Sequence, residues 1–576
     1  MKNLFTFLLC LSIFSSQLYA QSAYIYFDGN NVEALISAHG NHFWNYTTNH
    51  FKVPATGEAS SVFTSTLWFA GLDEDDSLYV AAERFRQMGY DYSPGPIGNP
   101  SSYDPPMNGD WNRLWKINRY EIQTWLDDPI NNPVPQDVLD WPAHGDTTLG
   151  QAYYLAPFVD VNDDGVYNPD DLDHPLMYGD QMVYFIFNDG AAPHTESGGR
   201  ALGIEIHGVA YGFDCPEDTA LNHALFFHHK VYNRSQRDYH DLKIGMWTDF
   251  DLGNAQDDYV GSDPLRNLYF AYNGDDLDED FGGSFGYGYN LPSQGVRILK
   301  GPKMEDDGID NEKSVVSGTY NGFGMDDGII DNEHHGLQGF VYHNNASGPT
   351  GDPSSPVDYF NYLNNNWRNG VAITYGGTGY DPSNPNAIES RFMLPDSSDS
   401  VFLSTSGVDP GFNWHEQQAS NSPSDRRGVG TIGQSGFNAG EAFEFDHVYV
   451  FAQKMNDRIG AVHKMKAYSD ELQAMFDEGG TICGDFNPVF DFEVGTTETK
   501  RQVIKMYPNP VSTLLRLDGV LPGQKVTVID VQGRELMQVQ VASNSVELNT
   551  NHLSPGIYMT RIEGGSFTST LKFSKQ

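Results

Sequence analysis

Oxygen-bearing residues recur at a defined spacing between residues 160 and 171. Within this run, oxygen side chains stand at positions 1, 3, 5, 9 and 12, which are Asp160, Asn162, Asp164, Asn168 and Asp171. Gly165 stands at position 6, where the chain must turn sharply, and the carbonyl of Val166 serves at position 7. Hard oxygen ligands around a glycine turn predict a calcium site. The alternative is an acidic turn that holds no metal.

Two further groups of aspartates lie in residues 249–335, the least regular part of the chain. The members of the first group are Asp249, Asp251, Asp257 and Asp258. The second group takes a pair from each copy of a short internal repeat, and its members are Asp306, Asp310, Asp326 and Asp331. Carboxylates at this density repel one another, and a divalent cation relieves that repulsion. Both groups are therefore candidate calcium sites, with solvated acidic turns as the alternative.

Other chemistries have weaker patterns. His228 and His229 are neighbours in a strand-like run, so they point to opposite faces and at most one can join a metal site. Residues 282–286 spell Gly-Gly-Ser-Phe-Gly, but no strand or helix pattern flanks them as a nucleophile elbow requires. Carboxylates are so numerous that no pair stands out for glycoside cleavage. The sequence therefore identifies no catalytic residues.

The composition of the chain limits its domain number, its partners and its fold class. The chain has 576 residues, which predicts two to four domains. The net charge is −43, which excludes nucleic acid as a partner because its phosphates would be repelled. A surface this acidic fits divalent-cation binding or simple solubility. Aromatic residues make up 13% of the chain and glycine is abundant, which favours short strands joined by elaborate turns.

The N-terminus predicts export. Residues 1–20 have the positive start, apolar run and small final residue of a signal peptide. No later segment has 18 consecutive apolar residues, so we expect no transmembrane segment in the mature chain. Cys10 lies in the leader, which leaves Cys215 and Cys483 to pair as a disulfide or to stay reduced.

The elements that would position the acidic groups are mainly strands. Strand patterns cover 182–187, 201–213, 221–233 and 442–453. Helical patterns cover 113–126 and 459–476. We predict a large, multi-sheet, β-rich body over residues 21–485 with a few helices, divided into one or two subdomains. A linker over 486–504 and a compact β unit over 505–576 would follow.

The C-terminal unit carries several motifs in order. They are Met-Tyr-Pro-Asn-Pro at 506–510, Val-Thr-Val-Ile-Asp at 526–530 and Leu-Ser-Pro-Gly at 553–556. Together they resemble the C-terminal sorting domain of type IX secretion cargo, the Por secretion tail. The resemblance implies an immunoglobulin-like β-sandwich whose partner is the type IX secretion machinery. It also implies passage through the periplasm and a final place outside the cell or on its outer surface.

Two resemblances concern the body. Motifs such as Trp-Pro-Ala-His-Gly-Asp at 141–146 and Asp-Phe-Asp-Leu-Gly-Asn at 249–254 resemble a family of large secreted proteins without an assigned activity. Residues 160–171 resemble the calcium loop of dockerins and EF-hands. Asp171 replaces the usual glutamate, and Pro175 blocks an exiting helix, so the resemblance implies a static calcium clamp. The repeats around Asp306 and Asp326 are similar to thrombospondin type 3 calcium repeats.

These observations lead to one main functional prediction. We expect an exported surface or extracellular protein with structural calcium, which acts in adhesion or matrix and has a surface glycan or matrix component as partner. The alternative is a secreted hydrolase that acts on polysaccharide or peptide. A metal site with an open position, or a carboxylate pair flanked by aromatic residues, would favour the hydrolase.

Overall fold

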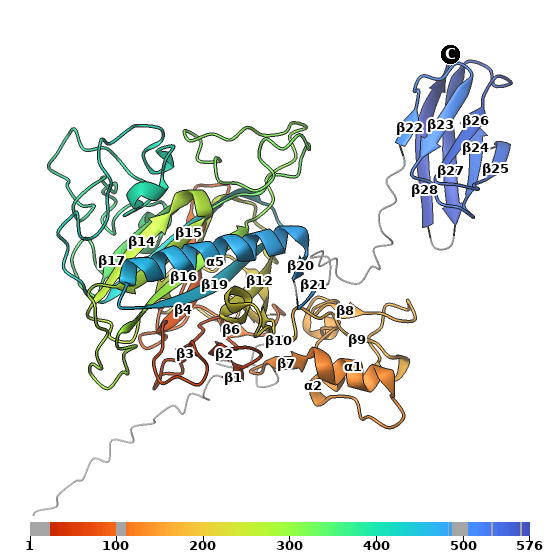
Figure 1. The fold of residues 1–576 in the computed structure, drawn as a ribbon. Coiled ribbons are helices and arrows are strands. Elements are labelled where there is room, and N and C mark those ends of the chain that lie inside the picture. The colour runs from red at the N-terminus through yellow and green to blue at the C-terminus, as the bar shows by residue number, and fades with distance from the viewer. Residues whose placement is uncertain (1–22, 100–110, 482, 486–504, 531–533, 565–566) are drawn as a thin grey trace, which may run out of the picture. The chain divides into compact units, whose positions relative to one another are not determined.

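The computed structural model describes most of the chain. The described residues are 23–99, 111–481, 483–485, 505–530, 534–564 and 567–576. The predicted signal peptide, residues 1–20, and the predicted linker, residues 486–504, lie outside these ranges. As predicted, the architecture is mainly β, with several antiparallel sheets and few helices (Figure 1). None of the helices in the described ranges is long and apolar enough to cross a membrane.

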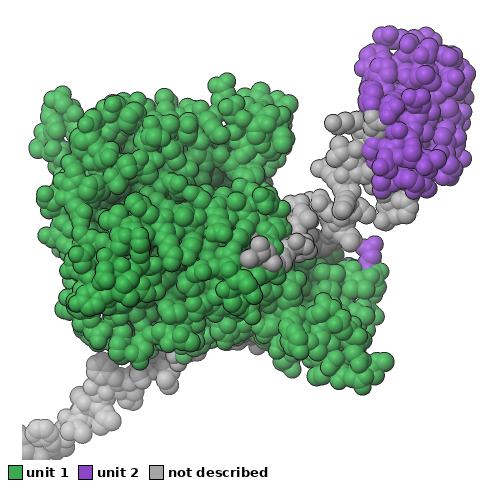
Figure 2. All heavy atoms as spheres, viewed as in Figure 1, with its two compact units in different colours: residues 1–162, 166–494 green, residues 163–165, 495–576 purple. Residues whose placement is uncertain are grey.

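The chain separates into two compact units (Figure 2). The first, which we call the body, comprises residues 1–162 and 166–494. The second comprises residues 163–165 together with 495–576. Each unit has its own hydrophobic core, so each is described by itself.

A nine-stranded antiparallel sheet is the larger layer of the body (Figure 1). Its strands in spatial order are β14 (Asp258–Asp263), β15 (Leu268–Asn273), β16 (Asn290–Lys300), β19 (Ala442–Met455), β12 (Ala224–Asn233), β11 (Ile204–Gly212), β10 (Gln181–Asn188) and β6 (Ser93–Pro94), with β7 (Trp115–Asn118) also paired to β10. The four strands that the sequence predicts correspond to β10, β11, β12 and β19. The second and third begin three residues later than predicted: β11 begins at Ile204, and α3 (Thr219–Asn222) precedes β12.

A five-stranded antiparallel sheet packs against one face of the larger sheet. Its strands in spatial order are β17 (Gly339–Asn344), β18 (Arg426–Phe437), β13 (Tyr239–Asp249), β4 (Thr64–Leu72) and β5 (Leu78–Ala82). The Tyr269 hydroxyl on β15 donates to the carbonyl oxygen of Met246 on β13 at 2.9 Å, and its ring stacks on Phe340 of β17. The two sheets therefore enclose one aromatic-rich core.

Smaller elements close the edges of this sandwich. β1 (Tyr24–Phe27), β2 (Glu33–Ser37) and β3 (Phe51–Lys52) form a three-stranded sheet that contributes to the same core. Two-stranded pairs are formed by β8 (Phe158–Val159) with β9 (His174–Pro175) and by β20 (Gly480–Thr481) with β21 (Gly484–Asp485). Their contribution is to fix loops rather than to extend the main sheets.

Helices cover the outer faces of both sheets. The longest, α5 (Arg458–Glu478), packs on β16 and β19 and buries Met465 and Leu472. Asp457 caps its first turn, and Gly479 ends it in the left-handed region with φ of 72°. The predicted second helix is thus confirmed. On the five-stranded sheet, α4 (Pro356–Leu363) packs against β4 and β5.

The first predicted helix is only partly correct. Its C-terminal part is α1 (Arg119–Asp127), and α2 (Gln136–Leu139) follows. Residues 115–118 instead form β7, in which Trp115 and Ile117 are buried while Lys116 and Asn118 are partly exposed. This period of two suits pairing with β10, and that tertiary contact outweighs the local helical pattern.

The second unit consists of two small antiparallel sheets around a common core, as expected for a β-sandwich. One sheet contains β22 (Lys505–Tyr507), β23 (Leu514–Asp518) and β26 (Ser545–Asn549). The other contains β25 (Glu535–Gln540), β24 (Lys525–Asp530), β27 (Gly556–Gly564) and β28 (Phe567–Lys575). Buried residues such as Leu515, Val528 and Phe573 form the core between them.

Candidate metal centre

Three carboxylates meet at one end of the five-stranded sheet: Asp249, Asp251 and Asp425, which we call the sheet-end cluster. Asp249 ends β13, Asp251 follows it closely, and Asp425 directly precedes β18. Because β13 and β18 are antiparallel neighbours, the end of one strand lies beside the start of the other. One oxygen from each side chain lies within 4.8 Å of the other two.

Arg427 on β18 is the cation that faces this cluster. Its Nε donates to Asp249 Oδ2 at 3.3 Å, and its Nη2 donates to Asp425 Oδ2 at 3.2 Å. Its Nη1 donates to both oxygens of Asp352 at 2.8 and 2.9 Å. One guanidinium therefore offsets several carboxylates, which leaves the cluster with net negative charge.

Asp249 has an oxygen that the protein leaves unused. The side chain is buried, with 2% exposure, and its Oδ1 has no hydrogen-bond partner among the described residues. The Oδ1 atom of Asp425 is also buried and also has no hydrogen-bond partner among the described residues. An acceptor that is buried without a partner costs about 1–3 kcal/mol, and more when it is charged. A cation held between these oxygens would remove that cost.

The environment raises the proton affinity of the cluster. Burial raises the pKa of Asp249 well above its ordinary value, although the charge of Arg427 opposes this effect. Burial, followed by the charge of Asp425, raises the pKa of Asp251 to about 7. Bare carboxylates are therefore disfavoured here, and either protons or a metal ion must compensate them.

A second group of carboxylates lies beside β14 and β15, and we call it the loop cluster: Asp257, Asp275 and Glu279. One oxygen of each lies within 4.8 Å of the others, and neither oxygen of Asp257 has a hydrogen-bond partner in the described part of the chain. Burial, followed by the charges of Asp278 and Glu279, raises the pKa of Asp257 to about 8.

The structure thus divides the four aspartates that the sequence groups together. Asp249 and Asp251 join one cluster and Asp257 joins the other. Asp258 belongs to neither: its Oδ2 accepts from the backbone N–H of Leu252 at 3.0 Å. The sequence prediction missed Asp425, because only the pairing of β13 with β18 brings it near Asp249.

Residues 160–171 form a loop between β8 and β9. At its base the buried carboxylate of Asp173 accepts the backbone N–H groups of Val161 and Asn168 at 2.8 and 2.9 Å. The amide of Asn168 donates to Asp171 at 2.6 Å, and Gly165, where a sharp turn is predicted, lies in the left-handed region with φ of 76°. Asp173 is a structural residue that the sequence prediction missed. Calcium binding by this loop stays a prediction.

The two internal repeats interlock. Asp331 Oδ1 accepts the N–H of Gly308 at 2.8 Å, and Asp310 Oδ2 accepts the N–H of Gly328 at 2.7 Å. Each repeat therefore supplies an aspartate to the glycine turn of the other. Asp306 forms an exposed ion pair with Lys303 at 2.6 Å, and the backbone N–H of Asp326 donates to the Asn311 carbonyl at 3.0 Å. Calcium at these four aspartates remains a prediction.

The histidines are separated, as the strand pattern predicts. The Nδ1 atom of His228 forms a hydrogen bond with Asp446 Oδ1 at 2.8 Å, and its ring stacks on Tyr178. This places His228 on the face of the sheet opposite the sandwich core. His229 points into the sandwich, where its ring stacks on His447. Within the described ranges, no three potential metal ligands that include a histidine lie within 4.8 Å of one another.

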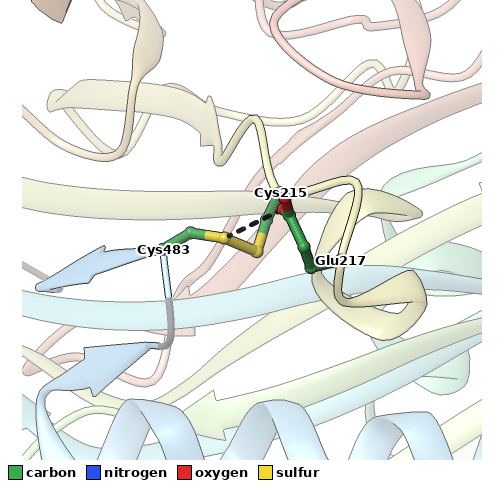
Figure 3. Close-up of side chains that lie close together, drawn as sticks. All are labelled: Cys215, Glu217 and Cys483. Carbon is green, nitrogen blue, oxygen red and sulfur yellow. Dashed lines mark hydrogen bonds between the residues drawn. A yellow bond between two sulfur atoms is a disulfide. The ribbon is translucent and has the colours of Figure 1, made fainter.

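Cys215 and Cys483 form a disulfide, which settles the alternative that the sequence left open (Figure 3). The bond ties the segment after β11 to the segment after α5. Glu217 lies beside it, with its Oε2 4.0 Å from the Cys483 sulfur. Because both sulfurs are oxidised, this group lacks the thiolates that would bind a metal.

Comparison with protein families identifies one domain. Residues 505–576 match the model of the secretion system C-terminal sorting domain, which confirms the resemblance seen in the sequence. The chain is therefore a cargo of the type IX secretion system and is secreted or displayed at the cell surface. No curated protein sequence matches the chain. The resemblance of the body to a family of secreted proteins gains no support from these comparisons.

Three solved structures show low similarity to the chain. The first is a polysaccharide lyase, at 7% identity and a TM-score of 0.18, with 74% of this chain and 37% of the lyase covered. The second is PorZ, a surface component of the type IX secretion system of Porphyromonas gingivalis, at 11% identity and a TM-score of 0.13, with 96% and 75% covered.

The third is the BSP domain of a biofilm-associated protein, at 9% identity and a TM-score of 0.12, with 61% of this chain and 59% of that chain covered. The chain spans only about a third of the lyase, at 37% of its length. At TM-scores this low, none of the three likenesses bears on the fold or the activity of the body.

Proposed function

We propose that the body is an extracellular, calcium-stabilised protein that acts in adhesion or in the surface matrix. The observation that supports this most directly is the sheet-end cluster, with its buried and unpartnered Asp249 oxygen. Calcium is bound by 6–8 oxygen ligands, and carboxylates are its usual charged partners. An ion between Asp249, Asp251 and Asp425 would bind the ends of two neighbouring strands together.

Such an ion would act by linkage. It binds the folded chain, in which β13 and β18 bring the carboxylates together, and it has little affinity for the unfolded chain, in which they are far apart. The loop cluster would hold a second ion by the same logic. Residues 160–171 would hold a third, through Asp160, Asn162, Asp164, the Val166 carbonyl, Asn168 and Asp171. Outside the cell, calcium is available to fill them.

Export and calcium binding are separate parts of this proposal. Deleting residues 505–576 should leave the body in the periplasm, because the sorting domain is lost. The matched control is the full chain with Asp160→Ala and Asp164→Ala, which should reach the surface while binding less calcium. Fractionation of cells and medium measures export, and calorimetric titration of the purified chain measures calcium binding. Surface display of the truncated chain would refute the sorting role.

A secreted hydrolase is the second candidate, and one observation favours it. Arg84 lies between Glu196, at 3.4 Å, and Asp352, at 3.0 Å. Burial raises the pKa of Glu196 to about 7. The pKa of Asp352 is lowered despite its burial, by the hydrogen bond to His343 and the charges of Arg427 and Arg84. Carboxyl groups with separated pKa values are typical of acid–base pairs.

The burial of Glu196 favours the structural function instead. Only 2% of its side chain is exposed, so a substrate has little access to the carboxyl group. The two candidates differ in a simple assay. If the body hydrolyses a polysaccharide or peptide, Glu196→Gln should abolish turnover. If the body is structural, the wild-type chain has no turnover on these substrates.

A further inference from the structure

A cavity of about 350 Å³ opens at the edge strand β17, and its residues were not among the candidate site residues. Its lining residues are Tyr342, Asn344, Thr350, Trp367, Thr378, Tyr380, Asn421, Ser422 and Arg426. We call it the Tyr342 pocket. Its volume is within the range of small-molecule sites, about 300–1,000 Å³. Three of the lining residues are aromatic, and five others carry a hydroxyl or a carboxamide.

Tyr342, Trp367 and Tyr380 form an aromatic wall of the pocket, and this wall is rigid. Tyr342 and Trp367 are buried and meet edge to face, with ring centroids 6.2 Å apart. Trp367 meets Tyr380 in the same way at 5.9 Å, and its indole N–H donates to the Gly379 carbonyl at 2.7 Å. Gly379 has a φ of 78°, and a Cβ there would lie 3.3 Å from the Trp367 ring. The aromatic wall is therefore held in place before any ligand binds.

The pocket offers no net positive charge. Arg426 lies under the Tyr342 ring, 4.7 Å from its centroid. Its guanidinium donates to the Asn344 side chain at 2.7 Å and to the Ser422 carbonyl at 2.9 Å. Its Nε lies 3.3 Å from the buried carboxylate of Glu416. Arg426 is thus neutralised and committed to the protein, so it does not serve an anionic ligand.

The rim retains unused polar groups. Tyr342 lines the pocket, and its hydroxyl oxygen, which has no hydrogen-bond partner among the described residues, is not one of the fully buried atoms. The Asn344 amide accepts from Arg426 through its oxygen, which leaves its N–H₂ group available as a donor. Thr350, Thr378 and Ser422 add hydroxyls around the opening. A ligand hydroxyl that bonds to the Tyr342 hydroxyl replaces solvent there, and such a hydrogen bond contributes about 1 kcal/mol.

We propose that the Tyr342 pocket binds one unit of a neutral glycan. A sugar ring has apolar faces that suit the partly exposed ring of Tyr380, which the buried Trp367 supports, and its hydroxyls both donate and accept as the rim requires. A net charge of −43 disfavours anionic polysaccharides. The inference deepens the proposed adhesive role by naming its ligand class. It uses none of the carboxylates in the two clusters, so its test is independent of calcium binding.

The test uses the full secreted chain with four neutral probes, the hexasaccharides of cellulose, xylan, mannan and chitin, and one anionic probe, polygalacturonate. Saturation-transfer NMR detects binding, and a titration gives the dissociation constant. At least one neutral hexasaccharide should bind. Tyr342→Phe keeps the ring and removes the hydroxyl, so it should weaken binding by about fivefold, the effect of one hydrogen bond. Tyr380→Ala removes part of the wall and should weaken it further.

Tyr289→Phe is the matched control, because Tyr289 is 59% exposed and lies outside the pocket. It should leave the dissociation constant unchanged. The inference is overturned if no neutral hexasaccharide binds, if both pocket variants bind as well as the wild type, or if polygalacturonate alone binds. A chain that binds calcium but no hexasaccharide would overturn this inference and leave the calcium proposal intact.

Discussion

The sheet-end cluster and the interlocked repeats are both rich in aspartate, but they satisfy their charges differently. In the repeats, Asp310 and Asp331 accept backbone N–H groups from the opposite copy at 2.7 and 2.8 Å. In the sheet-end cluster, Asp249 is buried and keeps an oxygen without a protein partner. Each region leaves one carboxylate oxygen unpaired, because Asp310 Oδ1 also lacks a hydrogen-bond partner among the described residues. The regions differ in that the repeats use backbone N–H groups on partly buried side chains, whereas the deeply buried Asp249 relies on the guanidinium of Arg427.

This difference shows what acidic density in a sequence does and does not indicate. A run such as Asp306-Asp307-Gly308 attracts attention because its carboxylates are close in the chain. Glycine turns, however, provide backbone donors that neutralise such carboxylates locally. The stronger need for an ion arises where strand pairing forces carboxylates together in a buried place. We expect the two regions to respond differently to substitution.

The largest difference should appear when the cation of each region is removed. Arg427→Met leaves Asp249 and Asp425 without their guanidinium, while Asp352 keeps its ion pair with Arg84. Loss of one partner from a buried ion pair typically costs about 3–5 kcal/mol. Urea denaturation at fixed calcium concentration measures the free energy of unfolding.

Lys303→Met is the matched variant for the repeats. Lys303 pairs with Asp306 at 2.6 Å, but both side chains are about half exposed, at 49% and 63%. An exposed ion pair is worth about 0–1 kcal/mol, so this variant should unfold almost as the wild type does. Equal losses in the two variants would contradict the contrast between the regions.

The buried histidines of the core give a second comparison, because they should make the stability of the body depend on pH. Burial lowers the pKa of His447 to about 3, and His42 and His229, which face it in the core, also have lowered pKa values. A histidine whose folded pKa lies below its unfolded value near 6.5 stabilises the chain fully above pH 6.5. That stability is lost as the pH falls toward 3.

His447→Phe keeps an aromatic ring beside Phe227 and removes the titrating group. Between pH 7.5 and pH 5.5, the wild type should lose about 1 kcal/mol more than this variant. Urea denaturation at the two pH values measures the difference. If the two chains lose the same stability, these core histidines do not govern the acid response. Because the histidine contribution to stability is constant above pH 6.5, the effects of calcium on stability are best compared above that pH.

The smallest effect concerns the repeats themselves. Asp331→Ala removes the acceptor of the Gly308 N–H, and Asp310→Ala removes the acceptor of the Gly328 N–H. Each hydrogen bond contributes about 1 kcal/mol, so amide hydrogen exchange should accelerate about fivefold at the glycine concerned. Each variant is the control for the other. Faster exchange at both glycines in either variant would show that the repeats open as one unit.

The fold was largely accessible from the sequence where the pattern is local. The alternation in β19 places Phe443, Phe445 and Tyr449 on one face, and the periodicity of 459–476 predicts α5. The order of strands was not accessible, because β16 and β19 are neighbours although they are far apart in the chain. Such pairings depend on the whole core and not on any local run.

The candidate site shows the same limit. Asp249 and Asp251 are recognisable from the sequence, since they stand close together in an acidic segment. Asp425 has no local signal, and only the register of β13 with β18 brings it to them. The Tyr342 pocket is likewise assembled from β17, the start of β18 and three loops, so its residues have no shared motif.

The central claim is that the sheet-end cluster holds a calcium ion, and calorimetric titration with calcium tests it most directly. Asp251→Asn removes one charge from the cluster, and asparagine tolerates the left-handed backbone of this residue, where φ is 42°. The titration should show one ion fewer for this variant than for the wild type, at pH 7.5. An unchanged number of bound ions would contradict the account.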